Sequence, residues 1–134
     1  MPDPASSLQV RDLVVQRGGR PVLHGISLAL LPGEVTALMG ANGAGKSSLV
    51  MTIAGVLPAT SGQIEVDGKN LLGRAPDAVR RHGITVVPEG HSVLPNLSVL
   101  ENLWAAGSAL RRPELEREVE RALEVFPELK PRLK

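Results

Sequence analysis

The sequence contains no cysteine, and this absence excludes several kinds of chemistry at once. Without a thiol the chain can form no disulfide framework, no cysteine-based zinc site and no thiol nucleophile. Aromatic side chains are almost as scarce, since Trp104 and Phe126 are the only ones in 134 residues. Proteins that bind single-stranded nucleic acid stack the bases on aromatic side chains. The composition therefore excludes such a platform, and we expect no nucleic-acid partner.

The chain also lacks an excess of charge of one sign and a long apolar run. Fifteen Lys and Arg oppose 14 Asp and Glu, so the net charge of +1 gives no field that would attract nucleic acid or an acidic membrane surface. No stretch approaches the roughly 20 apolar residues that span a bilayer, and the N-terminus has no secretory signal. We expect a cytoplasmic chain with a disordered tail at residues 1–7, and any membrane association must come through a partner.

The composition that remains is that of an ordinary globular domain, with 43% hydrophobic and 22% charged residues. Apolar residues alternate or run in short β-prone groups near the N-terminus, which predicts a β-rich opening at residues 8–15 and 25–31. Similar patterns predict further strands at residues 34–39, 63–66 and 84–87. Helix patterns and capping signals predict helices at residues 47–56, 76–82 and 98–106, and another that begins at Pro113.

One motif in the sequence is typical of a phosphate-binding loop. The pattern G-x-x-x-x-G-K-[ST] is matched in full by Gly40-Ala41-Asn42-Gly43-Ala44-Gly45-Lys46-Ser47, between a predicted strand and a predicted helix. The glycines let successive N–H groups point inward, and the helix adds the positive end of its dipole. A triphosphate with Mg²⁺ is the natural ligand. Lys46 would neutralise the β- and γ-phosphates, Ser47 would coordinate Mg²⁺, and Ser48 would donate near the α-phosphate.

A phosphate loop is shared by transporter ATPases, small GTPases and kinases, so the surrounding sequence decides between them. Residues 22–28, 61–68 and 83–90 resemble segments of the ABC family in order and in spacing. Residues 87–90 and 94–103 are similar to the branched-chain amino acid importers in particular. The resemblance covers residues 8–134. It implies an α/β fold, a P-loop NTPase of ABC type with a β-rich N-terminal subdomain, a partial parallel core sheet and the start of a helical subdomain.

The resemblance also implies roles for two residues outside the phosphate loop. Glu89 stands where most ABC proteins have a glutamine that senses the γ-phosphate through Mg²⁺ and water, and a carboxylate there can still accept from metal-bound water. Arg17 stands where the family usually has an aromatic that stacks on adenine. An arginine plane can stack on a base, but a solvated surface residue is the alternative. The expected metal ligands are thus Ser47 and Glu89, with ATP and Mg²⁺ as cofactors.

Three parts of an ABC ATP-binding domain are not found in this sequence. They are the signature loop, the acidic strand followed by a glutamate, and the late switch histidine, for which His24, His82 and His91 come too early. The chain is therefore interpreted as the incomplete N-terminal part of such a domain, with no catalytic residue of its own, and its ATPase activity stays open.

The resemblance implies partners as well. They are membrane permease subunits, a second ATP-binding subunit of the same or another kind, and indirectly an extracytoplasmic solute-binding protein. The chain would then lie peripherally on the cytoplasmic face of the cell membrane. Two other functions stay open: a truncated, non-catalytic nucleotide-binding or regulatory protein, and another P-loop enzyme such as a kinase.

Overall fold

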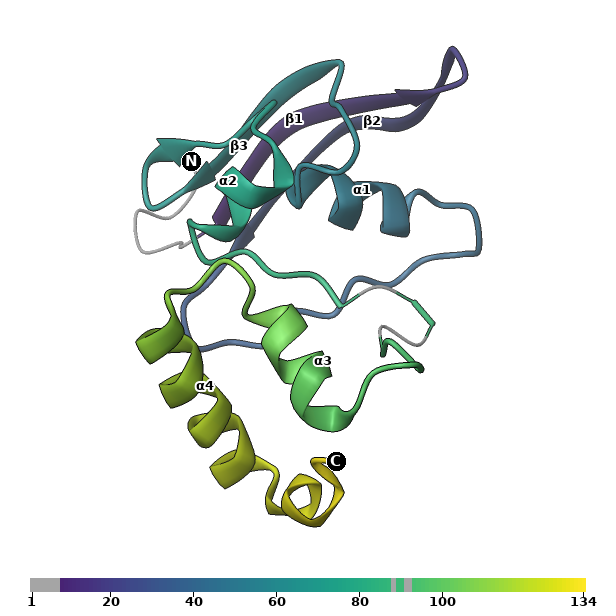
Figure 1. The fold of residues 1–134 in the computed structure, drawn as a ribbon. Coiled ribbons are helices and arrows are strands. Elements are labelled where there is room, and N and C mark those ends of the chain that lie inside the picture. The colour runs from purple at the N-terminus through teal and green to yellow at the C-terminus, as the bar shows by residue number, and fades with distance from the viewer. Residues whose placement is uncertain (1–7, 88, 91–92) are drawn as a thin grey trace. The chain divides into compact units, whose positions relative to one another are not determined.

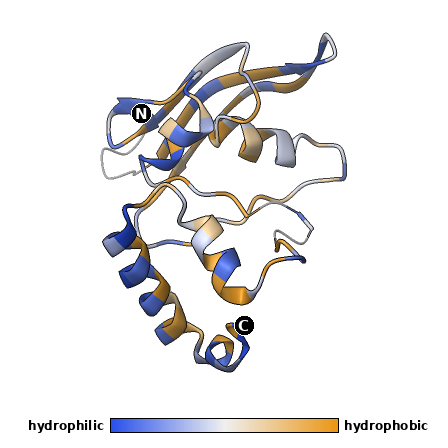
Figure 2. Ribbon diagram, in the orientation of Figure 1, coloured by the Kyte–Doolittle hydropathy of each residue, from blue (hydrophilic) through white to orange (hydrophobic). Residues whose placement is uncertain are grey.

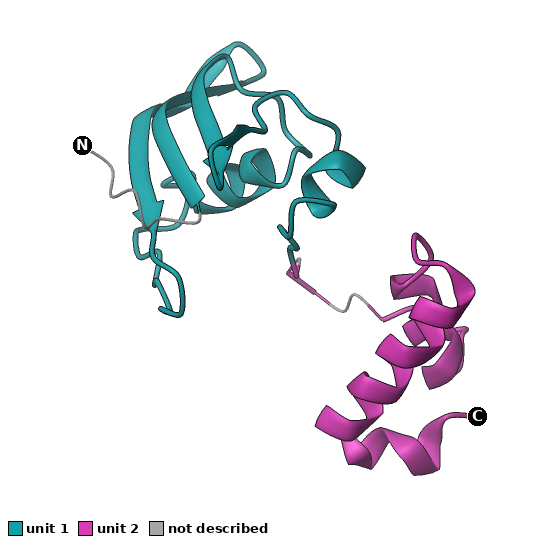
Figure 3. Ribbon diagram, turned by 90° about the vertical axis from the view of Figure 1, so that its left-hand side faces the viewer, with its two compact units in different colours: residues 1–86 teal, residues 87–134 magenta. Residues whose placement is uncertain are grey.

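A computed structural model describes residues 8–87, 89–90 and 93–134, which fall into two compact units (Figure 1, Figure 3). Unit 1 runs to Val86 and unit 2 comprises Val87–Lys134. Unit 1 holds the strands with two helices, and unit 2 is helical. None of the described helices is both long enough and apolar enough to cross a membrane. The predicted disordered tail at residues 1–7 lies outside the described residues.

Unit 1 is built on a four-stranded antiparallel sheet with the order β2-β1-β3-β4. Its strands are β1 (Leu8–Arg17), β2 (Arg20–Leu30), β3 (Ser61–Val66) and β4 (Lys69–Asn70). The turn between β1 and β2 consists of Gly18 and Gly19, whose positive φ angles of 57° and 75° suit a two-residue hairpin. The β-rich opening and the strand at residues 63–66 are thus confirmed.

The core of unit 1 lies where the sheet meets the two helices α1 (Lys46–Ile53) and α2 (Pro76–Arg80). Figure 1 shows both helices on one side of the strands. The buried side chains come from β1, β2, β3, both helices and the turn after β4, and include Val10, Leu13, Val15, Leu23, Leu49, Ile64, Leu71 and Val79. A bulge at Asp12, whose φ is 47°, shifts the register of β1. Val10 and Leu13 consequently both point into the core although they are three residues apart.

Unit 2 contains α3 (Val99–Ala106), α4 (Arg112–Val125) and the 3₁₀ helix η1 (Pro127–Arg132). Ser98 and Glu101 form a capping box that begins α3, as the sequence predicts. On α4 the charged and apolar residues separate onto different sides (Figure 2), and Val119 is its buried residue. The predicted helices at residues 98–106 and from Pro113 are confirmed within one or two residues, which is the usual uncertainty of helix ends.

Two predicted strands are wrong for this chain. Residues 34–39 and 84–87 form neither strand nor helix, and Val35 and Val87 are 101% and 85% exposed. An apolar run becomes a strand only when neighbouring strands accept its backbone hydrogen bonds. Among the described residues no segment pairs with either run. The expected parallel core sheet is therefore not formed here, and the described sheet is antiparallel.

Candidate phosphate-binding loop

The predicted phosphate loop, residues 40–45, leads directly into the N-terminus of α1. The first turn of the helix closes with a 2.9 Å hydrogen bond from the Leu49 N–H to the Gly45 carbonyl. Gly45 occupies the N-cap position with φ 92° and ψ 4°, and no side chain caps the helix. The N–H groups of a first helical turn have no intrahelical partner and carry positive partial charge. An anion at this end of α1 would accept hydrogen bonds from these backbone N–H groups.

Gly45 also fixes the loop against the sheet. A Cβ atom at this position would lie 2.7 Å from the Leu23 side chain and 2.7 Å from the Val22 carbonyl oxygen. No side chain fits in that space, and the positive φ disfavours one independently. The glycine therefore lets the start of α1 pack directly on β2, so that a rigid strand holds the loop in position.

The Lys46 ammonium group lies over the beginning of the loop. Its Nζ donates to the carbonyl oxygens of Gly40, at 2.7 Å, and Ala41, at 2.8 Å. These two bonds curl the side chain back over the loop, where a phosphate group would lie. An ammonium group has three N–H donors. Lys46 can therefore keep two bonds to the backbone and direct the third to a phosphate oxygen.

The remaining loop residues form an exposed turn. The Ala44 N–H donates to the Ala41 carbonyl at 3.1 Å, which places Asn42 and Gly43 at the tip. After the loop, Ser47 is exposed in the first turn of α1 and is available to a metal ion, whereas Ser48 is only 8% exposed. The expected contact of Ser48 with the α-phosphate stays a prediction.

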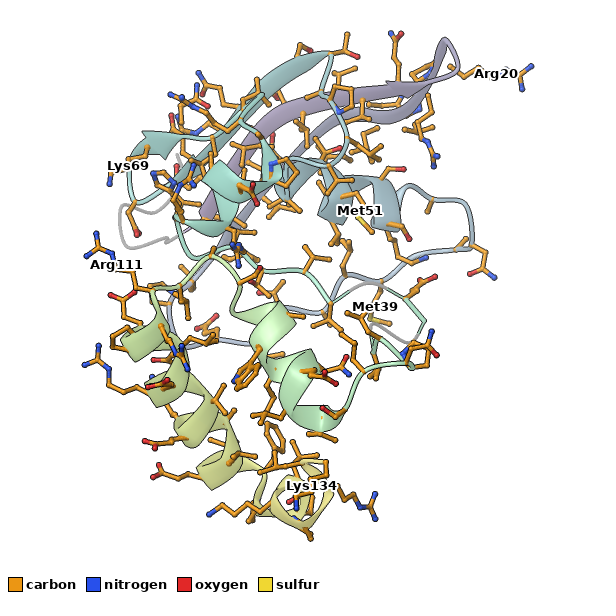
Figure 4. All side chains as sticks on the ribbon, in the orientation of Figure 1. Arg20, Met39, Met51, Lys69, Arg111 and Lys134 are labelled. Carbon is orange, nitrogen blue, oxygen red and sulfur yellow. The ribbon has the colours of Figure 1, made fainter. Side chains whose placement is uncertain are left out.

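Arg17 lies at the hairpin end of β1, directly opposite Arg20 in the register. Both side chains are exposed, and Figure 4 shows Arg20 pointing outward from the hairpin. Val22, whose carbonyl faces Gly45, follows Arg20 by two residues, or roughly 7 Å along a strand. The hairpin end is thus near the phosphate loop, as a base-contacting residue requires. Stacking of Arg17 on adenine stays a prediction.

Glu89, the other residue expected at the site, is exposed and belongs to unit 2, whereas the phosphate loop belongs to unit 1. Its role as a metal ligand stays a prediction. The described residues contain no group of three or more His, Asp or Glu that could hold a metal ion. Mg²⁺ usually keeps several waters and is bound by one or two protein groups together with substrate phosphates. The chemistry of the loop fits that mode of binding better than a metal site made by protein alone.

Sequence reasoning missed one polar residue outside the loop. The Asn102 side chain on α3 accepts a hydrogen bond from the Leu94 N–H, and its two amide N–H groups are shared among the carbonyl oxygens of Leu94, Leu97 and Ser98. An asparagine inside a predicted helix gives no signal that it bonds backward in the chain, because such a bond depends on the conformation of the loop.

β2 packs against the phosphate loop, and the loop leads into a helix whose N-terminus has no side-chain cap. This arrangement defines a phosphate-loop nucleotide-binding fold. A family profile described as "ABC transporter" matches residues 23–132. The chain belongs to the ABC transporter family.

Individual relatives agree with this assignment. The chain is 42% identical over 110 residues to the high-affinity branched-chain amino acid transport ATP-binding protein BraG of Pseudomonas aeruginosa, covering 82% of this chain and 47% of that protein. It is 39% identical over 97 residues to the ribose import ATP-binding protein RbsA of Bacillus subtilis, covering 72% of this chain and 20% of RbsA. The chain thus spans about half of BraG and about a fifth of RbsA.

Solved structures show the same fold. An ATP-binding cassette of an ABC transporter superposes with a TM-score of 0.80 at 25% identity, covering 96% of this chain and 56% of the cassette. An ATP-binding subunit of an ABC transporter superposes with a TM-score of 0.77 at 32% identity, covering 96% of this chain and 53% of the subunit. The expected class, a P-loop NTPase fold of ABC type, is confirmed.

Proposed function

We propose that the chain is the ATP-binding component of an ABC importer. The observation that carries the proposal is the start of α1, where an uncapped helix N-terminus and the Lys46 ammonium group converge on one loop. This arrangement favours a polyphosphate over other anions, because it combines several backbone donors with a fixed positive charge. BraG is named as a transport ATP-binding protein and RbsA as an import ATP-binding protein, and the second name supports import.

In this proposal two ATP-binding subunits enclose two ATP molecules, and their closure moves the permease from an inward-facing to an outward-facing state. Hydrolysis resets the cycle. The residues of this chain bind and orient the nucleotide. Lys46 would neutralise the outer phosphates, and Ser47 and Glu89 would each be a ligand to Mg²⁺, which would supply further positive charge when bound. Residues 90–102 would face the permease. The chain works as a peripheral subunit on the cytoplasmic face of the membrane.

Little hydrolysis is expected from these residues by themselves. Phosphoryl transfer to water requires a group that orients the attacking water, and no residue of this chain is proposed for that role. The 134-residue chain should bind ATP weakly and release phosphate at a negligible rate. Substantial phosphate release that disappears in Lys46→Ala would overturn this part of the proposal.

The transported solute is proposed to be a branched-chain amino acid. The similarity of residues 87–90 and 94–103 to that importer type and the 42% identity to BraG support it. Ribose is the second candidate, because several ribose import proteins match at 37–40% identity. Selectivity in such systems would belong to the permease and the solute-binding protein, so nothing in the phosphate loop distinguishes the two.

The test is ATP-driven uptake by vesicles that contain the chain with its permease subunits. Radiolabelled leucine and ribose are compared side by side, with Lys46→Ala as the inactive variant and Lys69→Ala as a matched lysine control outside the loop. Leucine uptake that requires Lys46 supports the proposal, and ribose uptake identifies a sugar importer. If neither solute enters but an added acceptor becomes phosphorylated, the chain is a kinase.

A further inference from the structure

The hairpin end between β1 and β2 carries two arginines side by side. Arg17 and Arg20 are direct partners in the register of the two strands, and the two-glycine turn lies between them. Residues directly opposite each other on antiparallel strands share a face of the sheet, with Cβ atoms about 5 Å apart. The two guanidinium groups can therefore reach the same ligand, although their like charges repel each other in its absence.

This face of the sheet is the one that carries α1 and the phosphate loop. Side chains alternate between the two faces along a strand, and Val15, two residues before Arg17, is fully buried in the core of unit 1. Val15 is paired with Leu23, whose side chain lies against Gly45 and leaves no room there for a Cβ atom. Arg17 thus lies roughly 7 Å along β1 from the strand pair that supports the start of α1.

Neither guanidinium group is used within unit 1. Both side chains are exposed, and in the part of the chain that the structure describes no carboxylate forms an ion pair with either. Figure 4 shows Arg20 pointing outward from the hairpin, and an exposed side chain changes rotamer within nanoseconds, so it can turn toward a ligand beside Arg17. Asp12 is the only acidic residue on the two strands, and its carboxylate accepts from the Ser27 hydroxyl near the bulge.

Unit 1 has no Phe, Tyr or Trp side chain for a base to stack on, because Trp104 and Phe126 both belong to unit 2. Recognition of a base at the hairpin end therefore depends on hydrogen-bond donors. Guanine presents two neighbouring acceptors, O6 and N7, to which arginine donates as a bidentate partner. Adenine presents N7 beside its N6 amino group, which is itself a donor and does not pair with a guanidinium group.

We infer that Arg17 and Arg20 form a base site that selects guanine over adenine, so that the phosphate loop binds GTP more tightly than ATP. The inference rests on the proposed function, in which residues 40–48 hold the phosphates of the nucleotide. One guanidinium group donates to O6 and N7, and the other donates to the second lone pair of O6. Stacking of Arg17 on the base, the alternative contact, would not distinguish the two purines, because every base has a π-face.

The experiment measures the dissociation constants of Mg-GTP, Mg-ITP and Mg-ATP for the 134-residue chain by calorimetry. ITP has O6 and N7 but lacks the 2-amino group of guanine, so it isolates the two acceptors that arginine recognises. We expect GTP and ITP to bind alike, and both about fivefold or more tighter than ATP. Fivefold is roughly the lower end of what a bidentate arginine–guanine pair contributes, which suits exposed side chains.

Arg17→Ala should bring the dissociation constants of GTP and ATP close to each other, and Arg20→Ala should reduce their ratio. Arg17→Lys keeps the positive charge but loses the bidentate fork, so it should lose the preference as well. Arg80→Ala is the matched control, because it removes an exposed arginine on α2 and should keep the wild-type ratio. Lys46→Ala should weaken all three nucleotides by the same factor, because its proposed contacts are with the phosphates.

Three results would overturn the inference: equal binding of GTP and ATP by the wild type, ITP that binds as weakly as ATP, or a full preference for GTP in Arg17→Lys. If Arg17→Ala fails to fold, Arg17→Lys decides in its place. Failure of the proposed function looks different and removes the base site with it. In that case none of the three nucleotides binds to the folded wild type, or Lys46→Ala binds all three as the wild type does.

Discussion

At the scale of single residues, Gly45 is the position where both packing and ligand binding depend on the absence of a Cβ atom. Its missing side chain lets the start of α1 approach Leu23 and the Val22 carbonyl, and its positive φ turns the chain into the helix. The phosphate-loop motif predicts this glycine, but the contact with β2 requires knowledge of which strand lies beside the loop. The sequence therefore identifies the ligand-binding residues, while the structure shows what supports them.

Gly45→Ala should destabilise unit 1 by about 3 kcal/mol, because left-handed strain of about 1–2 kcal/mol adds to the cost of overpacking. Urea unfolding measures the change. Gly68→Ala is the control, since its φ is 75° but a Cβ there meets nothing within 4 Å. The control should lose only the strain contribution, about 1 kcal/mol. Equal losses in the two variants would contradict the proposed packing of the loop on β2.

Thr52 on α1 carries a buried hydroxyl, 4% exposed, with no hydrogen-bond partner among the described residues. Leaving such a group unpaired costs about 1–3 kcal/mol. Thr52→Val removes the hydroxyl with little change of shape and should raise the free energy of unfolding by about 1 kcal/mol. The exposed Thr60→Val should change it by less than about 0.5 kcal/mol. A Thr52→Val chain less stable than the wild type would show that the hydroxyl is bonded, for example to a water.

At the scale of elements, the sequence predicts best those helices and turns whose structure is determined by residues close together in the chain. The capping box of α3, the apolar spacing of α4 and the glycine hairpin between β1 and β2 are each set by neighbours in the sequence. The segments at residues 34–39 and 84–87 are as apolar as the strands that form, but a strand there would need partner strands from distant parts of the chain. The hydrogen bonds of the Asn102 side chain were missed for a similar reason, because the backbone groups that it bonds to come together only once the loop has folded.

The capping box gives α3 a pH dependence. A hydrogen bond from the Ser98 backbone N–H, then one from its hydroxyl, lowers the pKa of Glu101 below the ordinary 4.5. Because the folded-state pKa is the lower one, this stabilisation is complete above about pH 4.5 and is lost as pH falls through the folded value. Glu101→Gln should flatten the urea-unfolding profile of the chain in that acid range. Glu120→Gln, which removes another exposed carboxylate from a helix, is the control.

At the scale of the whole molecule, the exposed apolar segments determine how the chain behaves in solution. Val35, Met39 and Val87 are 85% exposed or more and lie in segments that pair with no strand among the described residues. Unpaired apolar backbone of this kind is a template for pairing with other chains. BraG and the two solved structures are longer than this chain by roughly a factor of two.

The 134-residue chain should therefore self-associate, and Val35→Lys should reduce light scattering at a given concentration because a charge opposes strand pairing. Val125→Lys is the control, since Val125 is 64% exposed at the end of α4, where no strand template exists. Equal effects of the two substitutions would mean that association depends on general hydrophobicity and not on residues 34–39.

Calorimetric titration of the chain with Mg-ATP is the measurement that decides whether residues 40–48 bind the phosphates of ATP. We expect saturable binding that Lys46→Ala weakens by about tenfold or more, because a charged hydrogen bond to phosphate contributes about 1.5–3 kcal/mol. Lys69→Ala, at an exposed position on β4, should bind as the wild type does. Binding that is unaffected by Lys46→Ala, or no binding by the folded wild-type chain, would show that residues 40–48 are not the phosphate site.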